Sequence, residues 1–194
     1  MRATHKPADA LDLFGDLPDW WIAGGWAIDL WLGRTTRDHA DLDVATLRRS
    51  QRAFWVRLAD WDLHLGTAPD VVEPWVDRDV VPAPLHAVWC RPTPSSEWAF
   101  ELLLNDSDQT QWLFRRDHAV RMPLDDIART SGDGIPYLVP EIVLLYKAKS
   151  LTPKDTADFE AVVPRLDPGQ SAWLRRALAQ TTVGHPWLTS PHLL

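Results

Sequence analysis

Residues 21–44 read WIAGGWAIDLWLGRTTRDHADLDV and carry the pattern that decides the fold. The apolar run over 20–23 predicts a short strand, and Gly24 and Gly25 predict the turn that ends it. The apolar residues over 26–32 then predict a buried helix. Glycines allow a backbone to approach a bulky anion, and a helix N-terminus offers free N–H groups. This glycine turn is therefore a candidate cradle for a phosphate group.

Two aspartates follow in a segment that alternates like a strand. Over residues 40–46, ADLDVAT, Asp41 and Asp43 fall on one face of the predicted strand and the apolar residues on the other. Their Cα atoms would lie roughly 7 Å apart. Two carboxylates at that spacing suit Mg²⁺, which prefers hard oxygen ligands. The sequence therefore predicts a magnesium site at these two aspartates.

Cationic residues crowd the loop that leads into this strand, where they would neutralise phosphate charge. They are Arg34, Arg37 and His39. Each feature has an ordinary interpretation as well. A Gly-Gly pair is usually a plain turn, an Asp-x-Asp pair is commonly solvated, and a basic loop commonly faces water. It is their order and spacing together that favours a functional site.

The segment GGWAIDLWLGRTTRDHADLD resembles the signature of the nucleotidyltransferase superfamily related to DNA polymerase β. That signature is Gly-Gly, a spacer, and then Asp-x-Asp. The match is closest to the branch that includes the aminoglycoside and lincosamide adenylyltransferases, in which an aromatic residue follows the glycines, as Trp26 does here. The branch also has an Arg-x-His-x-Asp-x-Asp form, which is matched by Arg37, His39, Asp41 and Asp43.

The resemblance implies an α/β (α+β) fold with a nucleotidyltransferase-type mixed sheet flanked by helices. It also implies a two-metal reaction, in which an NMP, expected to be AMP, moves from an NTP to a hydroxyl of a small-molecule acceptor. ATP is the expected co-substrate, and an aminoglycoside- or lincosamide-type antibiotic is the acceptor class that the branch suggests. Two Mg²⁺ ions would be bound by Asp41 and Asp43. The nucleotide would be bound by Gly24, Gly25, Trp26, Arg37 and His39.

The superfamily usually adds a third carboxylate on a neighbouring strand, as a metal ligand or as the base for the acceptor hydroxyl. Glu101 is the candidate, because it is a charged residue within the apolar strand pattern WAFELLLN. The alternative is a strand edge where Glu101 faces solvent. Asp106 and Asp108 follow in the next loop and compete for the same role.

Lys147 and Lys149 are also candidates for contact with the nucleotide phosphates. Both lie in the largely apolar segment LLYKAKS, which predicts a helix. Residues two apart on a helix do not share a face, so they are not expected to do the same job, and Lys147 is favoured. The ordinary interpretation is that lysines near a helix C-terminus complement its dipole.

The rest of the chain predicts a mixed α/β core over 1–138 and a helical C-terminal segment over 139–194 that packs on the core. In the core we expect an amphipathic helix over 48–60 and an irregular stretch over 69–84. Further strands are expected over 61–67, 85–91, 98–104, 112–116 and 135–138. Those over 85–91 and 98–104 are expected to form a hairpin. Helices are expected near 140–150, 153–163 and 168–180, because Pro140, Pro153 and Pro168 suit first helical positions.

The composition is that of an ordinary globular chain of 194 residues, with 45% hydrophobic and 24% charged residues. The single cysteine, Cys90, excludes an intramolecular disulfide framework and fits a reducing compartment. No signal peptide or membrane span is apparent, so we expect a cytoplasmic protein with no membrane partner. The net charge of −7 argues against broad binding of nucleic acid.

Two other functions remain open at this point. One is a nucleotidyltransferase that modifies a protein partner, as members of bacterial toxin–antitoxin pairs do. The other is a non-catalytic nucleotide-binding module that keeps the fold without turnover. Binding of NTPs without pyrophosphate release on any acceptor would favour the module.

Overall fold

The computed structural model describes residues 5–68, 71–77 and 79–193. The strands are β1 (Trp20–Ile22), β2 (Asp43–Leu47), β3 (Asp62–Ala68), β4 (Val71–Pro74), β5 (Ala87–Arg91), β6 (Phe100–Ser107), β7 (Gln111–Leu113), β8 (Arg121–Pro123), β9 (Ala128–Thr130) and β10 (Pro136–Leu138). The helices are α1 (Pro7–Phe14), α2 (Gly24–Leu32), α3 (Gln51–Arg57), α4 (Pro140–Lys147), α5 (Pro153–Val162) and α6 (Pro168–Thr181). Short 3₁₀ turns lie at 48–50, 163–165 and 186–189.

The strands form one mixed sheet in the order β4-β3-β5-β6-β2-β1-β10-β9, and β7 joins β6 to β8. β2 runs parallel to β6 and antiparallel to β1, while β1 runs parallel to β10. The expected hairpin is present, since β5 and β6 pair antiparallel. This is the expected mixed α/β architecture with helices against a mixed sheet.

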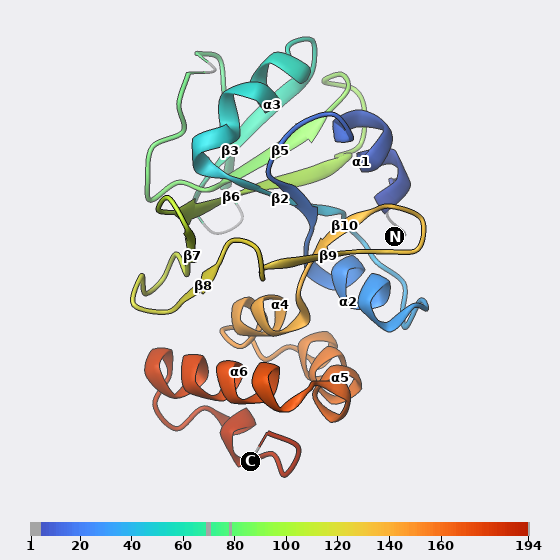
Figure 1. The fold of residues 1–194 in the computed structure, drawn as a ribbon. Helices are drawn as coiled ribbons and strands as arrows, with labels where there is room; N and C mark the ends of the chain where they lie inside the picture. The colour runs from blue at the N-terminus through green and yellow to red at the C-terminus, as the bar shows by residue number, and fades with distance from the viewer. Residues whose placement is uncertain (1–4, 69–70, 78, 194) are drawn as a thin grey trace.

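One face of the sheet is covered by α1 and α3 (Figure 1) and holds an aromatic core. The ring centroid of Phe14 in α1 lies 5.2 Å from that of Phe54 in α3 and 5.4 Å from that of Phe100 in β6. Side chains alternate along a strand, so Glu101, which follows Phe100, points to the opposite face. The alternation thus separates the core from a polar face.

The helices α4, α5 and α6 lie together at the other end of the molecule from α3 (Figure 1). α4 packs against α2 and α6, and α5 packs against α2 and α4. All three begin at the expected prolines. The division into a core of 1–138 and a segment of 139–194 stays a prediction. None of the helices in the described ranges is long and apolar enough to cross a membrane.

Several element boundaries differ from those expected. The helix predicted over 26–32 begins at Gly24, so the glycines form its first residues and Gly24 takes a left-handed φ of 57°. The strand predicted over 40–46 begins only at Asp43, and Asp41 lies before it. The helix predicted over 48–60 is a 3₁₀ turn followed by the shorter α3.

Additional strands appear where none were expected. β4 lies in the stretch predicted to be irregular, where it adds to the edge of the sheet beside β3. β8 and β9 are three-residue strands that pair with β7 and β10. Segments this short carry too little alternation to be distinguished from loops, because their form depends on the neighbouring strand.

Candidate active site

Asp43 and Glu101 lie side by side on the open face of the sheet. They are Cα partners in the parallel pairing of β2 with β6. Their neighbours Val44 and Leu102 are fully buried on the core face, so both carboxylates project from the other. Asp41 approaches the same place from the residues just before β2. The register therefore brings Asp43 and Glu101 together, and Asp41 lies near enough for its charge to act on both.

The three acids repel one another, and burial adds to that effect. Burial, followed by the charges of Asp43 and Asp41, raises the pKa of Glu101 to about 8. Burial and the charge of Asp41 raise the pKa of Asp43 to about 6, although nearby Lys147, Lys154 and Arg37 act in the opposite direction. Both shifts express the cost of holding several carboxylates in one partly buried place.

A divalent cation fits this group of acids. Their oxygens are the ligands that Mg²⁺ prefers, and a cation would offset the repulsion that raises both pKa values. Within the described ranges, no three His, Cys, Asp or Glu side chains are already arranged as a metal cluster. The fit therefore rests on the kind of donor and on the electrostatics of Asp41, Asp43 and Glu101.

The two glycines are required by the close approach of site side chains. A Cβ on Gly24 would collide with the carboxylate of Asp43, and one on Gly25 would collide with the guanidinium of Arg37 and the ring of His39. In addition, Ala23 N donates a hydrogen bond to the backbone oxygen of Asp43 at 2.9 Å. The start of α2 and the start of β2 are thus in direct contact.

The loop between α2 and β2 is fixed by a buried acid that sequence analysis did not select. Asp29 is 5% exposed, and its Oδ2 lies 2.6 Å from His39 Nε2. Its Oδ1 accepts hydrogen bonds from the backbone N–H and the hydroxyl of Thr36, at 3.0 and 2.5 Å. The ring of His39 stacks on Trp26 with centroids 4.3 Å apart. Trp26 Nε1 in turn donates to the backbone oxygen of Asp41 at 3.2 Å.

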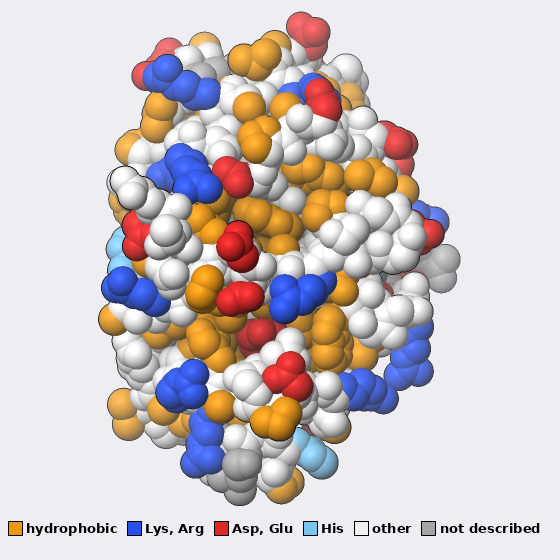
Figure 2. All heavy atoms as spheres, viewed as in Figure 1, with side chains coloured by type: hydrophobic (Ala, Val, Ile, Leu, Met, Phe, Trp, Pro, Cys, Tyr) orange, Lys and Arg blue, Asp and Glu red, His pale blue; other side chains and the backbone are white. Residues whose placement is uncertain are grey.

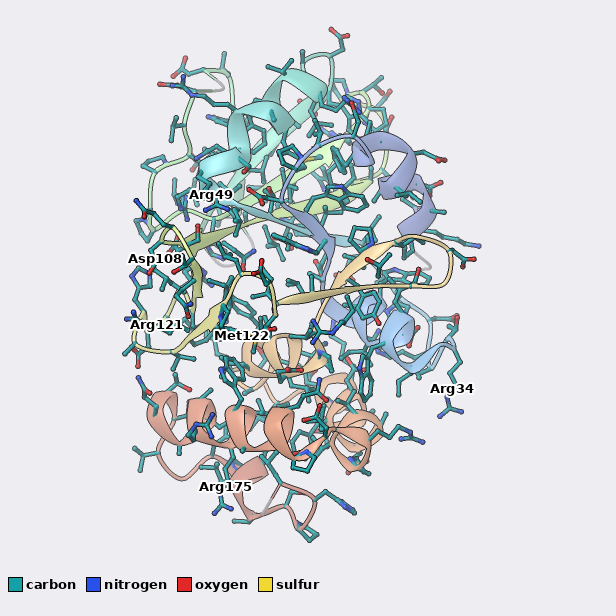
Figure 3. The ribbon with its side chains drawn as sticks, viewed as in Figure 1. Arg34, Arg49, Asp108, Arg121, Met122 and Arg175 are labelled. Atoms are coloured by element: carbon teal, nitrogen blue, oxygen red, sulfur yellow. The ribbon has the colours of Figure 1, made fainter. Side chains whose placement is uncertain are left out.

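Trp26 and His39 therefore help to hold Asp41 in place, and their expected contact with the nucleotide stays a prediction. Arg34 of the same loop is exposed and points away from the body of the molecule (Figure 3). The signal that could have revealed Asp29 is its position as the only charged residue of an otherwise apolar helix.

Arg37 and Lys147 meet at a second buried acid, Asp158 of α5. Arg37 Nε and Nη2 each donate to the Asp158 carboxylate at 3.2 Å. Lys147 Nζ lies 2.9 Å from Asp158 and donates to Asp155 at 3.0 Å. Asp155 also receives a hydrogen bond from the hydroxyl of Thr152 at 2.6 Å. This network connects the loop before Asp41 to the C-terminal helices.

A cavity of about 500 Å³ lies between the acids and α4 and α5. The cavity is lined by four of the residues expected from the sequence, which are Gly24, Asp43, Glu101 and Lys147. It is also lined by four cationic or titratable residues that were not among the expected site residues, which are His86, Arg115, Arg116 and Lys154. Burial, with Arg115 nearby, lowers the pKa of His86 to about 4, so this ring is neutral near neutral pH. The cavity therefore joins the acids to a cationic wall.

The other sequence candidates lie elsewhere. Lys149 is exposed and does not line the cavity. The carboxylate of Asp106 accepts a hydrogen bond from Arg48 Nε at 2.7 Å, and that of Asp108 accepts from the N–H groups of Thr110 and Gln111. Asp108 lies beside Arg49 at the edge formed by β7 (Figure 3).

Charges of both signs surround apolar patches on the face shown in Figure 2, so this face is not a uniformly basic surface. Such interspersed charge does not provide the continuous cationic stripe that binds a nucleic-acid backbone.

Known proteins that are similar to this chain include antibiotic adenylyltransferases. The model of the aminoglycoside-2''-adenylyltransferase family matches residues 9–69. The lincosamide antibiotic adenylyltransferase LnuA, solved with lincomycin bound, is similar with a TM-score of 0.56 and 18% identity, over 83% of this chain and 97% of that one. ANT(2'')-Ia in complex with adenylyl-2''-tobramycin gives a TM-score of 0.52 and 18% identity, over 90% of this chain and 94% of that one.

At such identities the solved structures establish the fold alone. A comparison with curated proteins found no match. The family match includes the glycines, the loop after α2 and both aspartates. Over that segment the chain is therefore similar to the aminoglycoside-2''-adenylyltransferase family, and its fold is that of the antibiotic adenylyltransferases.

Proposed function

We propose that this chain transfers AMP from ATP to a hydroxyl of a small-molecule acceptor in a Mg²⁺-dependent reaction. The observation that carries the proposal is the register of β2 with β6, which sets Asp43 directly beside Glu101. Asp41 and the glycine-led start of α2 lie next to them. The proposal extends to an antibiotic acceptor, because the two similar structures hold lincomycin and an adenylylated tobramycin.

The residues divide into an acidic half and a cationic half. Asp41 and Asp43, with Glu101, would hold the metal, which when bound would supply Lewis-acid polarisation and neutralise phosphate charge. The first N–H groups of α2 face the triphosphate. Lys147 and Lys154, which line the same cavity, balance the charge of its outer phosphates.

The reaction forms one bond and breaks another. The acceptor oxygen bonds to the α-phosphorus, the bond from that phosphorus to the oxygen of the leaving group breaks, and pyrophosphate departs. The proton of the acceptor hydroxyl passes to a base, and Glu101 is the carboxylate placed for it if it is not a metal ligand. A Glu101→Gln variant with an unchanged rate at every pH would remove Glu101 from the role of base.

The test uses the full chain with each of ATP, GTP, CTP and UTP, Mg²⁺, and lincomycin or tobramycin as acceptor. We expect pyrophosphate release, and an increase in acceptor mass by one nucleoside monophosphate, in at least one combination. Chelation of Mg²⁺ should abolish both signals. Thermal stabilisation by an NTP without release on any acceptor would instead indicate a nucleotide-binding module, and labelling of a protein would indicate the toxin–antitoxin type.

A further inference from the structure

The row of side chains that begins with Asp43 and Glu101 continues across the sheet. Trp89 on β5 is the Cα partner of Glu101, and His64 on β3 is the Cα partner of Trp89. Residues directly opposite one another share a face, with Cβ atoms about 4.5–5.5 Å apart. An aromatic side chain therefore lies on the open face immediately beside the candidate base.

Trp98 completes a small aromatic wall, by which we mean His64, Trp89 and Trp98. Its ring centroid lies 5.0 Å from that of His64 and 5.9 Å from that of Trp89, both in edge-on arrangements. Arg91 lies on the same wall, with its guanidinium carbon 4.4 Å from the centroid of Trp98. These contacts hold the rings in place through other side chains of the open face rather than through the hydrophobic core.

The aromatic wall keeps part of its surface open. Its three members are all half-buried, whereas Val88 and Cys90, which alternate with Trp89 along β5, are fully buried on the core face. An indole presents a large rigid surface with few rotatable bonds, and such rings commonly pack against ligands as well as against cores. The wall therefore offers a preformed apolar surface next to Glu101.

The two sides of Glu101 differ in charge. The cavity on one side is lined by Lys147, Lys154, Arg115 and Arg116 and suits the triphosphate. At the aromatic wall, the acid Asp62 is already paired, with Arg91 Nε at 2.6 Å and His64 Nε2 at 3.2 Å. Such a surface favours an apolar or weakly charged ring over a ligand with many positive charges.

We propose that the aromatic wall is the acceptor subsite, and that it takes a hydroxylated saturated ring carrying at most one positive charge. Such a ring stacks its C–H face on Trp89 and Trp98 and directs a hydroxyl toward Glu101. The inference rests on the proposed function, because it assigns the acceptor of the same site. It also predicts that lincomycin, which has one amine, binds better than tobramycin, which has many.

The test is binding without nucleotide, followed through the indole N–H signals of the ¹⁵N-labelled full chain. Trp89→Phe, Trp98→Phe and Trp173→Phe assign the relevant signals, and Trp173, which lies in α6 and is not part of the aromatic wall, serves as the matched control. We expect lincomycin to shift the signals of Trp89 and Trp98 and to leave that of Trp173 in place. Tobramycin should shift them only at higher concentration.

A second measurement uses Trp98→Leu, with correct folding checked by its remaining indole signals. The apparent Kd for lincomycin should rise about tenfold, while stabilisation by ATP is unchanged. Unmoved Trp89 and Trp98 signals, or tighter binding of tobramycin, would overturn the subsite. Because the titration contains no nucleotide, a failure to transfer AMP would count against the proposed function and leave this result standing.

Discussion

The buried acids of this chain lie in two regions that differ in how far their charges are neutralised by neighbouring side chains. Near α2 and α5, Asp29, Asp155 and Asp158 are each held by hydrogen bonds or ion pairs from nearby side chains. On the open face of the sheet, Asp43 and Glu101 lie beside each other, and in the described ranges their carboxylates accept no hydrogen bond. Their pKa values are raised, whereas that of Asp155 is lowered by Thr152 and Lys147 despite its burial.

The difference separates acids that the fold itself neutralises from the acids to which the proposed function assigns the chemistry. An acid neutralised within the protein is locked in one geometry and stabilises the fold. An acid held beside like charges destabilises the fold and gains stability when a cation arrives from solution. Substitutions in the two regions should therefore affect different quantities.

The largest expected effect is on turnover. Asp43→Asn should lower the transfer rate on the order of 10³-fold, because it removes a charged oxygen ligand at the reacting phosphate. Its thermal midpoint should equal or exceed that of the parent, since one of the mutually repelling charges is gone. The exposed Asp125→Asn is the matched control, and pyrophosphate release with differential scanning calorimetry measures both quantities. Full activity in Asp43→Asn would remove the metal assignment.

The next effect is on stability in the paired region. Asp158→Ala should lower the free energy of unfolding by about 3 kcal/mol, because Arg37 loses its carboxylate and Lys147 keeps only Asp155. Glu160→Ala, at an exposed position of the same helix, should change it by less than about 0.5 kcal/mol. Denaturant unfolding measures both variants. Equal stabilities would show that the network does not join the loop to α5.

The two regions meet where Gly24 of α2 approaches Asp43. The importance of this contact can be tested by comparing Gly24 with Gly33, a glycine of similar backbone conformation. Gly24→Ala and Gly33→Ala both force an alanine into a left-handed φ, at 57° and 66°, but only the Cβ at position 24 meets Asp43. Gly33→Ala should cost about 1 kcal/mol. Gly24→Ala should cost about 2 kcal/mol more and reduce transfer, as followed by unfolding and pyrophosphate assays. Two variants with the same activity would show that this contact does not shape the site.

The last prediction concerns a buried acid that combines features of both regions, because it has a hydrogen-bond partner and yet a raised pKa. Glu141 of α4 is 5% exposed and accepts a hydrogen bond from Gln170 at 3.0 Å. Burial, with Asp167 adding and Arg129 opposing, raises the pKa of Glu141 to about 7. Because the folded pKa lies above the unfolded value, its stabilising contribution is complete below about pH 4.5 and is lost as the pH rises through 7.

Glu141→Gln should therefore remove a stability loss of about 3 kcal/mol between pH 4.5 and pH 8. The quantity to measure is the difference in free energy of unfolding between the variant and the parent across that interval. A difference that stays constant with pH would mean that Glu141 ionises normally in the folded state.

The sequence predicted the individual helices and strands around the candidate site better than it predicted the contacts between them. The glycine pair, the helix after it, the hairpin and the three C-terminal helices all appear. Alternation along β6 indicated that Glu101 was unusual, but no local pattern shows which strand lies beside another. That pairing of β2 with β6 is what places Glu101 next to Asp43.

The roles of Asp29 and Asp158 escaped prediction for the same reason. Each has a partner in a different element, and a helical acid without its partner resembles any solvated charge. The contact of Trp26 with His39 and with the backbone of Asp41 was not expected either, because it joins α2 to the loop before β2. The residues that line the cationic wall come from separate segments that meet only after folding.

The parallel register of β2 with β6 also limits how related sequences can vary in length. One residue inserted or deleted within either strand would exchange the two faces of that strand. In β6 the change would move Glu101 into the hydrophobic interior and Phe100 or Leu102 toward water. The connection over 92–99, between β5 and β6, is free of that restriction as long as both of these strands keep their phase and Trp98 keeps its ring contacts. Length changes compatible with this fold should therefore gather in that connection.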